Sequence, residues 1–278
     1  YPGVDEVFDY IRMGDNVVWQ VSGLDEYRLF AEAFARQAMK DGRNLIYMHY
    51  TRHESMFSPG PGLKVFEFDP MQGFEPFTVD IYHRITEEGE GAFYIFDCLS
   101  ELQVAWHTDQ MMGNFFRVTC PYLYELNTVA YFPVIRGRHS FETMASIRDT
   151  TQVLIDVYTS DSAVYIHTLK AMDRESVNIY LPHVSRSGGP FKPLDGGVAL
   201  SRYYKLLDDI SAHTQDQNLD SHDRFFALAK LEFGRGKFRD ETERKILESM
   251  MSKDPHVQKL IPQLFEPKDY FSLRDRMI

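Results

Sequence analysis

The sequence is poor in cysteine, in positive charge and in long apolar runs. Only two cysteines occur in 278 residues, Cys98 and Cys120, and no C-x-x-C spacing is present. This shortage argues against a disulfide framework and against a structural zinc site. We therefore expect a reduced, cytoplasmic setting in which both thiols are buried and inert.

Positive charge is the second shortage. Lysine and arginine total 30 against 41 acidic residues, which gives a formal net charge of -11. A surface of that sign repels nucleic acid and anionic lipid unless basic residues gather locally, and no basic run occurs. No stretch of about 18 apolar residues and no basic leader before an apolar run is present either. We expect no nucleic-acid partner, no membrane span and no signal peptide.

Apolar residues are nevertheless plentiful, at 44% hydrophobic and 14% aromatic, so a sizeable core is expected. Residues 17–21 are a short apolar run typical of a strand buried on both faces. Apolar positions recur at helical spacing over residues 27–38, and residues 44–50 follow as a second strand. Because parallel neighbours need a crossover connection, this order predicts an α/β fold with a mostly parallel sheet flanked by helices.

Other elements follow from the same patterns. Strands are expected at residues 64–68, 92–96, 128–134, 152–157 and 163–169, the last two as a hairpin. Helices are expected at residues 74–88 and 140–150, and one or two helices at residues 102–116. Glycine, serine and proline gather between residues 185 and 197, and only helical patterns follow, at residues 200–212, 221–233, 239–251 and 256–264. We therefore divide the chain into an α/β domain (1–184), a linker (185–199) and a helical connector (200–278).

The turn after the first strand, residues 22–26, is where an open α/β sheet could hold phosphate. Such a loop works because backbone N–H groups at a helix N-terminus face the anion while a lysine neutralises it. Here Asp25 and Glu26 stand in the first helical turn and would repel a triphosphate by about 1 kcal/mol per charge. Ser22 and Asp25 have the spacing of a capping box, so we interpret the turn as an ordinary capped helix start. Arg28 could replace a lysine only with a different reach and geometry.

Residues 1–15 resemble the segment that precedes the first core strand in the KaiC/RecA-like ATPase family, including a Gly-Asp turn. In that family a G-x-x-x-x-G-K-[ST] loop follows the strand. The matching stretch here is residues 21–28, with Tyr27 and Arg28 where lysine and threonine are expected, so the Walker A motif is absent. The resemblance implies a RecA-like fold with degenerate nucleotide-binding candidates at Ser22, Gly23, Tyr27 and Arg28.

Later segments resemble other landmarks of the same family. Glu54 matches the carboxylate that orients attacking water, and Asp97, after residues 93–96, matches the Walker B aspartate. Lys170 and Arg174 match the basic pair that trails the closing strands. The resemblance implies Glu54 and Asp97 as vestigial catalytic candidates, Asp97 as a Mg²⁺ ligand, and ATP with Mg²⁺ as the candidate cofactor. The alternative is that both carboxylates only cap turns or accept hydrogen bonds.

A narrower resemblance is to the N-terminal region of proteins related to phosphoenolpyruvate synthase and pyruvate phosphate dikinase. It is carried by residues 14–21, 96–100, 113–116, 118–126, 138–141, 261–270 and 274–278. It implies an accessory or regulatory module without ordinary ATPase activity, whose partner is a phosphoenolpyruvate-synthase-like kinase domain, fused or separate. Two alternatives stay open: an atypical ATPase that uses Glu54 and Asp97, and a module that forms homo-oligomers.

Two residue clusters have a plain structural interpretation. His49, His53 and Glu54 could suggest a metal site, but residues at a strand end need not converge, so we expect none. Five aromatic residues could stack a base but are expected in the core: Trp106, Phe115, Phe116, Tyr122 and Tyr124.

Overall fold

The computed structural model describes residues 3–50, 54–106, 108–160, 163–176, 178–217 and 241–250. Its contacts divide the chain into two units, Tyr1–Ser201 and Arg202–Ile278. The first unit holds the sheet and all of the candidate site residues. In the second unit, the described part is helical.

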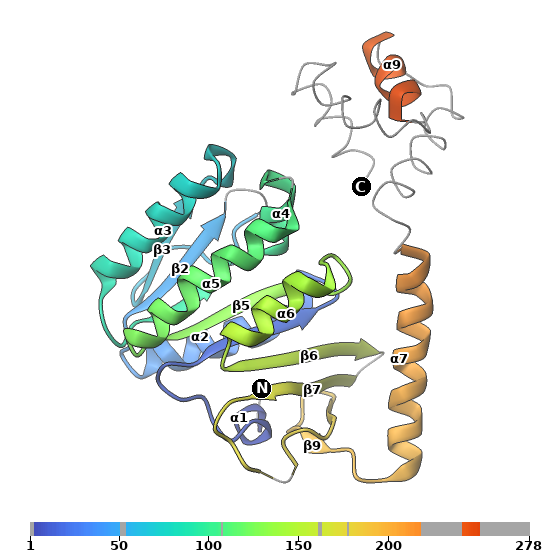
Figure 1. Cartoon of the computed structure of the whole chain (residues 1–278). Coiled ribbons are helices and arrows are strands. Elements are labelled where there is room, and N and C mark those ends of the chain that lie inside the picture. The colour runs from blue at the N-terminus through green and yellow to red at the C-terminus, as the bar shows by residue number, and fades with distance from the viewer. Residues whose placement is uncertain are drawn as a thin grey trace. The chain divides into compact units, whose positions relative to one another are not determined.

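The described part of the first unit is built on a sheet of nine strands in the order β3-β2-β4-β5-β1-β6-β7-β8-β9 (Figure 1). The strands are β1 (Asn16–Val21), β2 (Leu45–Tyr50), β3 (Leu63–Phe68), β4 (Phe93–Phe96), β5 (Val129–Ile135), β6 (Val153–Ser160), β7 (Ala163–Ala171), β8 (His183–Arg186) and β9 (Lys192–Pro193). Strands from β3 to β6 are parallel, and β7, β8 and β9 add antiparallel pairs at one side. The predicted α/β class with a mostly parallel sheet is confirmed.

Helices cover both faces of this sheet (Figure 1). They are α1 (Val4–Val7), α2 (Leu24–Lys40), α3 (Phe74–Glu88), α4 (Ser100–Trp106), α5 (Asp109–Glu125) and α6 (Phe141–Thr150), with a 3-10 turn at Pro70–Gln72. The apolar stripe of α2 packs on one face, in a cluster that includes Trp19 and Tyr131. Helices α3, α4, α5 and α6 pack on the other face around Phe96 and Phe132. The amphipathic spacing in the sequence thus produces one buried layer on each side.

The central strand is β1, which pairs with β5 on one side and β6 on the other. Val17 lies opposite both Tyr131 and Val153. A strand with neighbours on both sides and helices on both faces exposes none of its side chains to water. Both faces of the strand are therefore apolar, which explains the continuous apolar run at residues 17–19. The 2-residue turn at Gly42, with φ 65, ends α2 and leads the chain back toward β2.

The expected linker at residues 185–199 is wrong in part, because its first half belongs to the sheet. Ser185 pairs with Val164 in β7, and Lys192 pairs with Val184. Gly188 and Gly189, two of the glycines that suggested a linker, instead form a tight turn, in which Gly188 has φ 74 and the Ser185 hydroxyl donates to the Gly189 carbonyl at 2.6 Å. Helix α7 (Gly197–Gln217) then begins at residue 197.

The helical expectations differ from the structure mainly in length. The one or two helices expected at residues 102–116 are α4 and α5, and α5 continues to Glu125 through Pro121 because Cys120 and Leu123 extend its buried stripe. After α7, the next described helix is α9 (Glu241–Met250), within the expected helix at residues 239–251. The helices expected at residues 221–233 and 256–264 lie outside the described residues. In the described part of the chain, none of the helices is long and apolar enough to cross a membrane.

The two thiols and most of the singled-out aromatic residues lie in the core. Cys98 and Cys120 are free and buried, and burial raises the pKa of the Cys98 thiol to about 12, so it stays protonated at neutral pH. Phe115 and Phe116 are fully buried. On the outer surface, by contrast, Tyr122 stacks on the ring of Tyr82 at 4.3 Å and Tyr124 is exposed.

Candidate functional site

The strand order points to the carboxyl ends of β1 and β5 as the place for a site. The chain leaves β1 toward α2 on one face, and leaves β5 toward α6 on the other face. Open α/β sheets bind ligands where the connections of two neighbouring strands diverge in this way. Ser22 follows β1 and Arg136 follows β5, so these residues stand at the divergence.

The carboxylate of Glu26 accepts hydrogen bonds from both sides of the turn between β1 and α2. The backbone N–H of Ser22 donates to Glu26 Oε2 at 2.6 Å, and the Thr159 hydroxyl donates to Glu26 Oε1 at 2.6 Å. Glu26 is 8% exposed, so this carboxylate is largely removed from solvent. The chain thereby supplies its own anion to the N-terminus of α2.

The expected capping box between Ser22 and Asp25 is wrong. The N-cap of α2 is Gly23, which makes no side-chain cap, and Asp25 is exposed. The acid that reaches back is Glu26, one residue further on, because the helix begins one residue later than the spacing suggested. The Ser22 hydroxyl accepts a hydrogen bond from Arg136 at 2.9 Å instead of capping the helix.

Arg136 is held at the same divergence by several partners. Its guanidinium donates to the Ser22 hydroxyl, to the Val157 carbonyl at 2.7 Å and to the Gln20 carbonyl at 3.2 Å. It pairs with Asp156 Oδ1 at 3.3 Å and lies 3.9 Å above the ring of Tyr158. The guanidinium therefore joins the ends of β1 and β6 to the loop after β5.

Burial and Arg136 act in opposite directions on Asp156. Burial raises the pKa of its carboxyl above the ordinary value, while the guanidinium and the Tyr158 hydroxyl, at 3.1 Å, stabilise the charged form. The sequence offered no local signal for this cluster, because its members come from three strands that only the folded topology brings together.

Tyr27 and Arg28, expected near a nucleotide, lie in different surroundings. Tyr27 is fully buried, and its hydroxyl lies 3.3 Å from the carbonyls of both Phe96 and Tyr131. Burial raises its pKa well above the ordinary value, which keeps it a neutral hydrogen-bond donor to the backbone of β4 and β5. Arg28 is exposed on the outer side of α2. Ser22 and Gly23 remain at the loop, as expected.

Asp97 is fully buried at the carboxyl end of β4. Its Oδ2 accepts the Tyr50 backbone N–H at 2.9 Å and lies 3.9 Å from His49 Nε2. This carboxylate therefore joins β4 to the end of β2, which is the hydrogen-bonding role given as the alternative. Glu54 is exposed in the loop after β2, directly after the undescribed residues 51–53.

No group of three metal-binding side chains converges within the described residues. His49 is buried beside Asp97, with its Nδ1 4.0 Å from Glu67 Oε1. His53 lies outside the described residues, so the cluster of His49, His53 and Glu54 is described only in part.

Lys170 and Arg174 lie at the opposite end of the parallel strands, where these strands begin. Lys170 pairs with Leu154 near the start of β6, and its Nζ donates to the carbonyls of Arg148 at 2.6 Å and Asp149 at 3.2 Å. Burial lowers the pKa of this lysine. The amine thus binds the C-terminal carbonyls of α6, and the structure does not bring it to Asp97.

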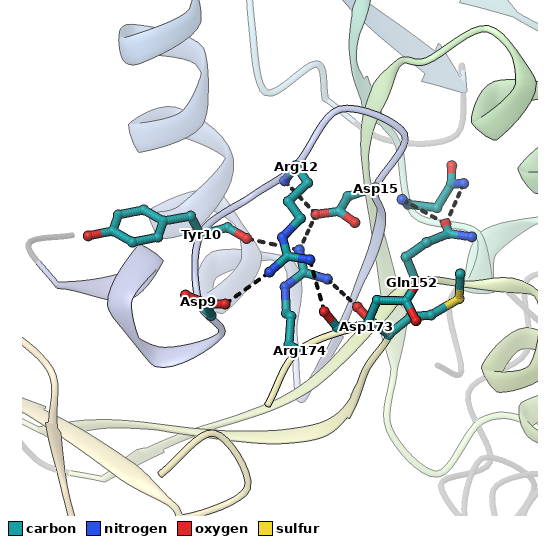
Figure 2. A network of polar contacts seen from close by, with 9 residues as sticks. Asp9, Tyr10, Arg12, Asp15, Gln152, Asp173 and Arg174 are labelled. Atoms are coloured by element: carbon teal, nitrogen blue, oxygen red, sulfur yellow. Dashed lines mark hydrogen bonds and ion pairs between the residues drawn. The ribbon is translucent and has the colours of Figure 1, made fainter. Parts of the chain in front are cut away.

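Arg174 belongs to a buried network at the amino end of β1 (Figure 2). It pairs with Asp15, the residue before β1, and the two side chains are 1% and 6% exposed. Its guanidinium also donates to the carbonyls of Tyr10 at 2.8 Å and Met172 at 3.0 Å. Arg12, alongside, donates to Asp9 and to the Asp173 carbonyl, both at 2.9 Å. This network joins the N-terminal segment to the end of β7.

A serine, a histidine and an aspartate form a hydrogen-bonded chain that the sequence did not reveal. Ser100 Oγ lies 2.7 Å from His139 Nε2, and His139 Nδ1 lies 2.6 Å from Asp109 Oδ1. The order resembles that of a nucleophile, a base and an orienting acid. However, Ser100 is fully buried, the His139 side chain is 1% exposed, and the Ile135 N–H donates to Ser100 Oγ at 2.8 Å. A substrate therefore has no access to the Ser100 hydroxyl. The hydrogen-bonded series of Ser100, His139 and Asp109 instead holds three loops together.

Asp109 is the charged end of that chain. Burial alone would raise its pKa, but hydrogen bonds from His139, the Ser140 N–H and Thr143 outweigh burial and lower it below the ordinary value. The carboxylate therefore stays ionised at neutral pH and anchors the loop between β5 and α6.

A comparison of the chain with protein-family models finds no match, and a comparison with curated proteins finds none either.

Proposed function

We propose that this chain is an accessory or regulatory module of RecA-like topology without ordinary ATPase activity, associated with a phosphoenolpyruvate-synthase-like kinase domain, fused or separate. The family link rests on the sequence resemblance described above. The observation that carries the loss of ATPase activity is the occupation of the Ser22 N–H by Glu26. Two free, buried thiols support a reduced, cytoplasmic setting for the module.

The strand order supports the RecA-like part of the proposal. In this chain β1 lies between β5 and β6 at the centre of the parallel strands, and a phosphate loop follows a central first strand in that family. In this chain Glu26 already accepts a hydrogen bond from the Ser22 N–H, and Arg136 already donates one to the Ser22 hydroxyl. A phosphate group would have to displace Glu26 or lie within a few ångströms of it, at a repulsion of about 1 to 4 kcal/mol per charge pair, depending on solvent screening.

The rival proposal, an atypical ATPase that uses Glu54 and Asp97, has less support. Asp97 is fully buried and bonded to the Tyr50 N–H, so a magnesium ion would have to break that strand-to-strand contact. The assembly-module proposal, with homo-oligomers formed through sheet edges, is tested by the mass of the particle in light scattering: a monomer at high concentration contradicts it.

Calorimetry tests the loss of nucleotide binding. We expect no saturable heat when the purified chain is titrated with Mg-ATP, Mg-ADP or phosphoenolpyruvate up to about 1 mM, which would place any Kd above that of ordinary nucleotide sites. Micromolar binding of Mg-ATP that Asp97→Asn abolishes would overturn the proposal in favour of the ATPase. Lys170→Met is the matched control, because that amine lies at the opposite edge of the sheet.

The association with a kinase is tested separately. The complete gene product, or the chain mixed with a purified phosphoenolpyruvate-synthase-type enzyme, is assayed for pyruvate-dependent conversion of ATP to AMP, phosphate and phosphoenolpyruvate. We expect activity in the complete product, or a changed KM in the mixture. A product without this activity, together with no effect on the separate enzyme, contradicts the association.

A further inference from the structure

A cavity of about 470 Å³ lies at the amino-terminal edge of the parallel strands, away from Glu26 and Arg136. Its walls are the segment around α1, the inner side of α2, and the first residues of β4 and β5. The proposed function does not use this cavity. Its volume is in the range of sites that enclose small molecules.

Aromatic rings form the floor of the cavity. Phe34 on α2 lies 5.5 Å from the ring of Phe93 and 4.2 Å from the ring of Tyr131, in both cases nearly parallel. Phe30 also lines the cavity and stacks on Trp19 at 4.2 Å. A floor of flat rings favours a ligand with a flat apolar body over a branched or strongly hydrated one.

The charged residues at the rim differ in the partners that their side chains already have. Arg12 is bonded to Asp9 and Asp173, and both carboxylate oxygens of Asp41 accept from the Gln37 amide at 2.9 and 3.0 Å. Arg43 instead lies over Phe93, one of the floor rings, with its guanidinium carbon 5.2 Å from the ring centroid. The planar guanidinium is therefore presented beside the aromatic floor, where it can bind a carboxylate through two parallel N–H groups.

Tyr131 supplies a second polar group. It lines the cavity, and the residue is 4% exposed. Burial, together with the charges of Asp5 and Asp15, raises its pKa, so the hydroxyl stays a neutral donor. A phenol hydroxyl that lines a cavity can donate a hydrogen bond to a ligand held there.

We propose that this cavity is a binding site for a small aromatic carboxylate, with the ring on the floor of Phe34 and Phe93, the carboxylate on Arg43, and the Tyr131 hydroxyl as a hydrogen-bond donor to the ligand. Asp5 and Asp41 line the same cavity, so the experiment compares the carboxylate with neutral and cationic probes of similar shape.

Trp19 provides the reporter, since it stacks on Phe30 and lies 5.4 Å from Tyr131, both of which line the cavity. The chain has two tryptophans, and Trp106→Phe removes the other, which lies on the opposite face. Three probes of matched shape differ in charge: phenylacetate, neutral phenylacetamide and cationic phenethylamine. We expect phenylacetate to change Trp19 fluorescence saturably and to bind at least about fivefold more tightly than the other two.

Variants locate the site. Arg43→Gln should weaken phenylacetate binding about tenfold and Tyr131→Phe about threefold, whereas Arg36→Gln, an exposed arginine of α2 outside the lining, should leave it unchanged. Ala33→Leu fills the cavity and should abolish binding while circular dichroism stays that of the parent. The proposal is overturned if phenylacetate gives no saturable change up to about 10 mM, if phenethylamine binds as tightly, or if Arg43→Gln has no effect.

Discussion

An arginine lies at each end of the parallel strands, one at the carboxyl ends (the carboxyl edge) and one at the amino ends (the amino edge). The two arginines are buried to different degrees. At the carboxyl edge, Arg136 and Asp156 keep 14% and 10% of their side chains exposed. At the amino edge, Arg174 and Asp15 keep only 1% and 6%. Both guanidiniums also bind backbone carbonyls from neighbouring segments.

The difference in burial matches a difference in use, because α/β folds commonly bind ligands at the carboxyl ends of the strands and close the core at the amino ends. The carboxyl edge is the usual ligand site of such sheets, and here internal groups occupy it while still touching solvent. The amino edge is not a usual ligand site, yet here it holds both a buried ion pair and the aromatic cavity beside α2. A ligand is therefore expected where the sheet is least often used for binding.

Breaking the amino-edge pair should have the largest effect. Arg174→Met leaves the Asp15 carboxylate buried without its counter-ion, so we expect a loss of about 3 to 5 kcal/mol in the free energy of unfolding. Urea denaturation measures it. The double variant with Asp15→Asn should lose less than the single one, because no buried charge is left; an equal or larger loss would show that the charge is not what matters.

The corresponding change at the carboxyl edge should cost less. We expect Arg136→Met to lower the free energy of unfolding by about 2 kcal/mol, because Asp156 and the freed carbonyls retain some contact with water. The same urea series gives the comparison directly. A loss that equals or exceeds that of Arg174→Met would remove the distinction between the two edges.

Glu26 tests the internal anion. Glu26→Ala leaves the Ser22 N–H and the Thr159 hydroxyl without their acceptor, at a cost of about 1 to 2 kcal/mol. Glu26→Gln keeps one acceptor oxygen and should cost about half as much. Thermal unfolding of both variants, with Asp25→Ala as the exposed control, measures the effect; identical melting temperatures for all three would contradict the role given to Glu26.

The smallest effect concerns pH at the carboxyl edge. The Asp109 pKa is lowered in the folded chain, so its carboxylate contributes stability above the ordinary aspartate pKa, about 3.9, and loses it as the pH falls toward the folded value. Asp109→Asn should cost about 1 kcal/mol at pH 7. Urea denaturation between pH 7 and about pH 3 should show the gap to the parent narrowing; a gap that widens on acidification would contradict the sign.

The local parts of this fold could be predicted from the sequence, and the long-range parts could not. The helix at residues 74–88 followed from apolar spacing and from Gly89, which ends it with φ 74. The place of Asp25 and Glu26 in the first turn of α2 also followed, since it needs only neighbouring residues. Arg136 meets Ser22 across more than a hundred residues, and only the strand order makes them neighbours. Ser185 was misread for the opposite reason: a tight turn and a linker have the same local composition.

The position of β1 has a consequence for synthesis on the ribosome. Its partners opposite Val17 are Tyr131 and Val153, so an apolar strand with two open edges emerges long before either neighbour. At about 5 to 20 residues per second, that wait lasts on the order of 5 to 25 s. Ribosome-bound chains that stop before β5 should be cleaved readily by protease and captured by chaperones, and those that have released β6 should resist. Early resistance would show that α2 and β2 protect the strand before its partners arrive.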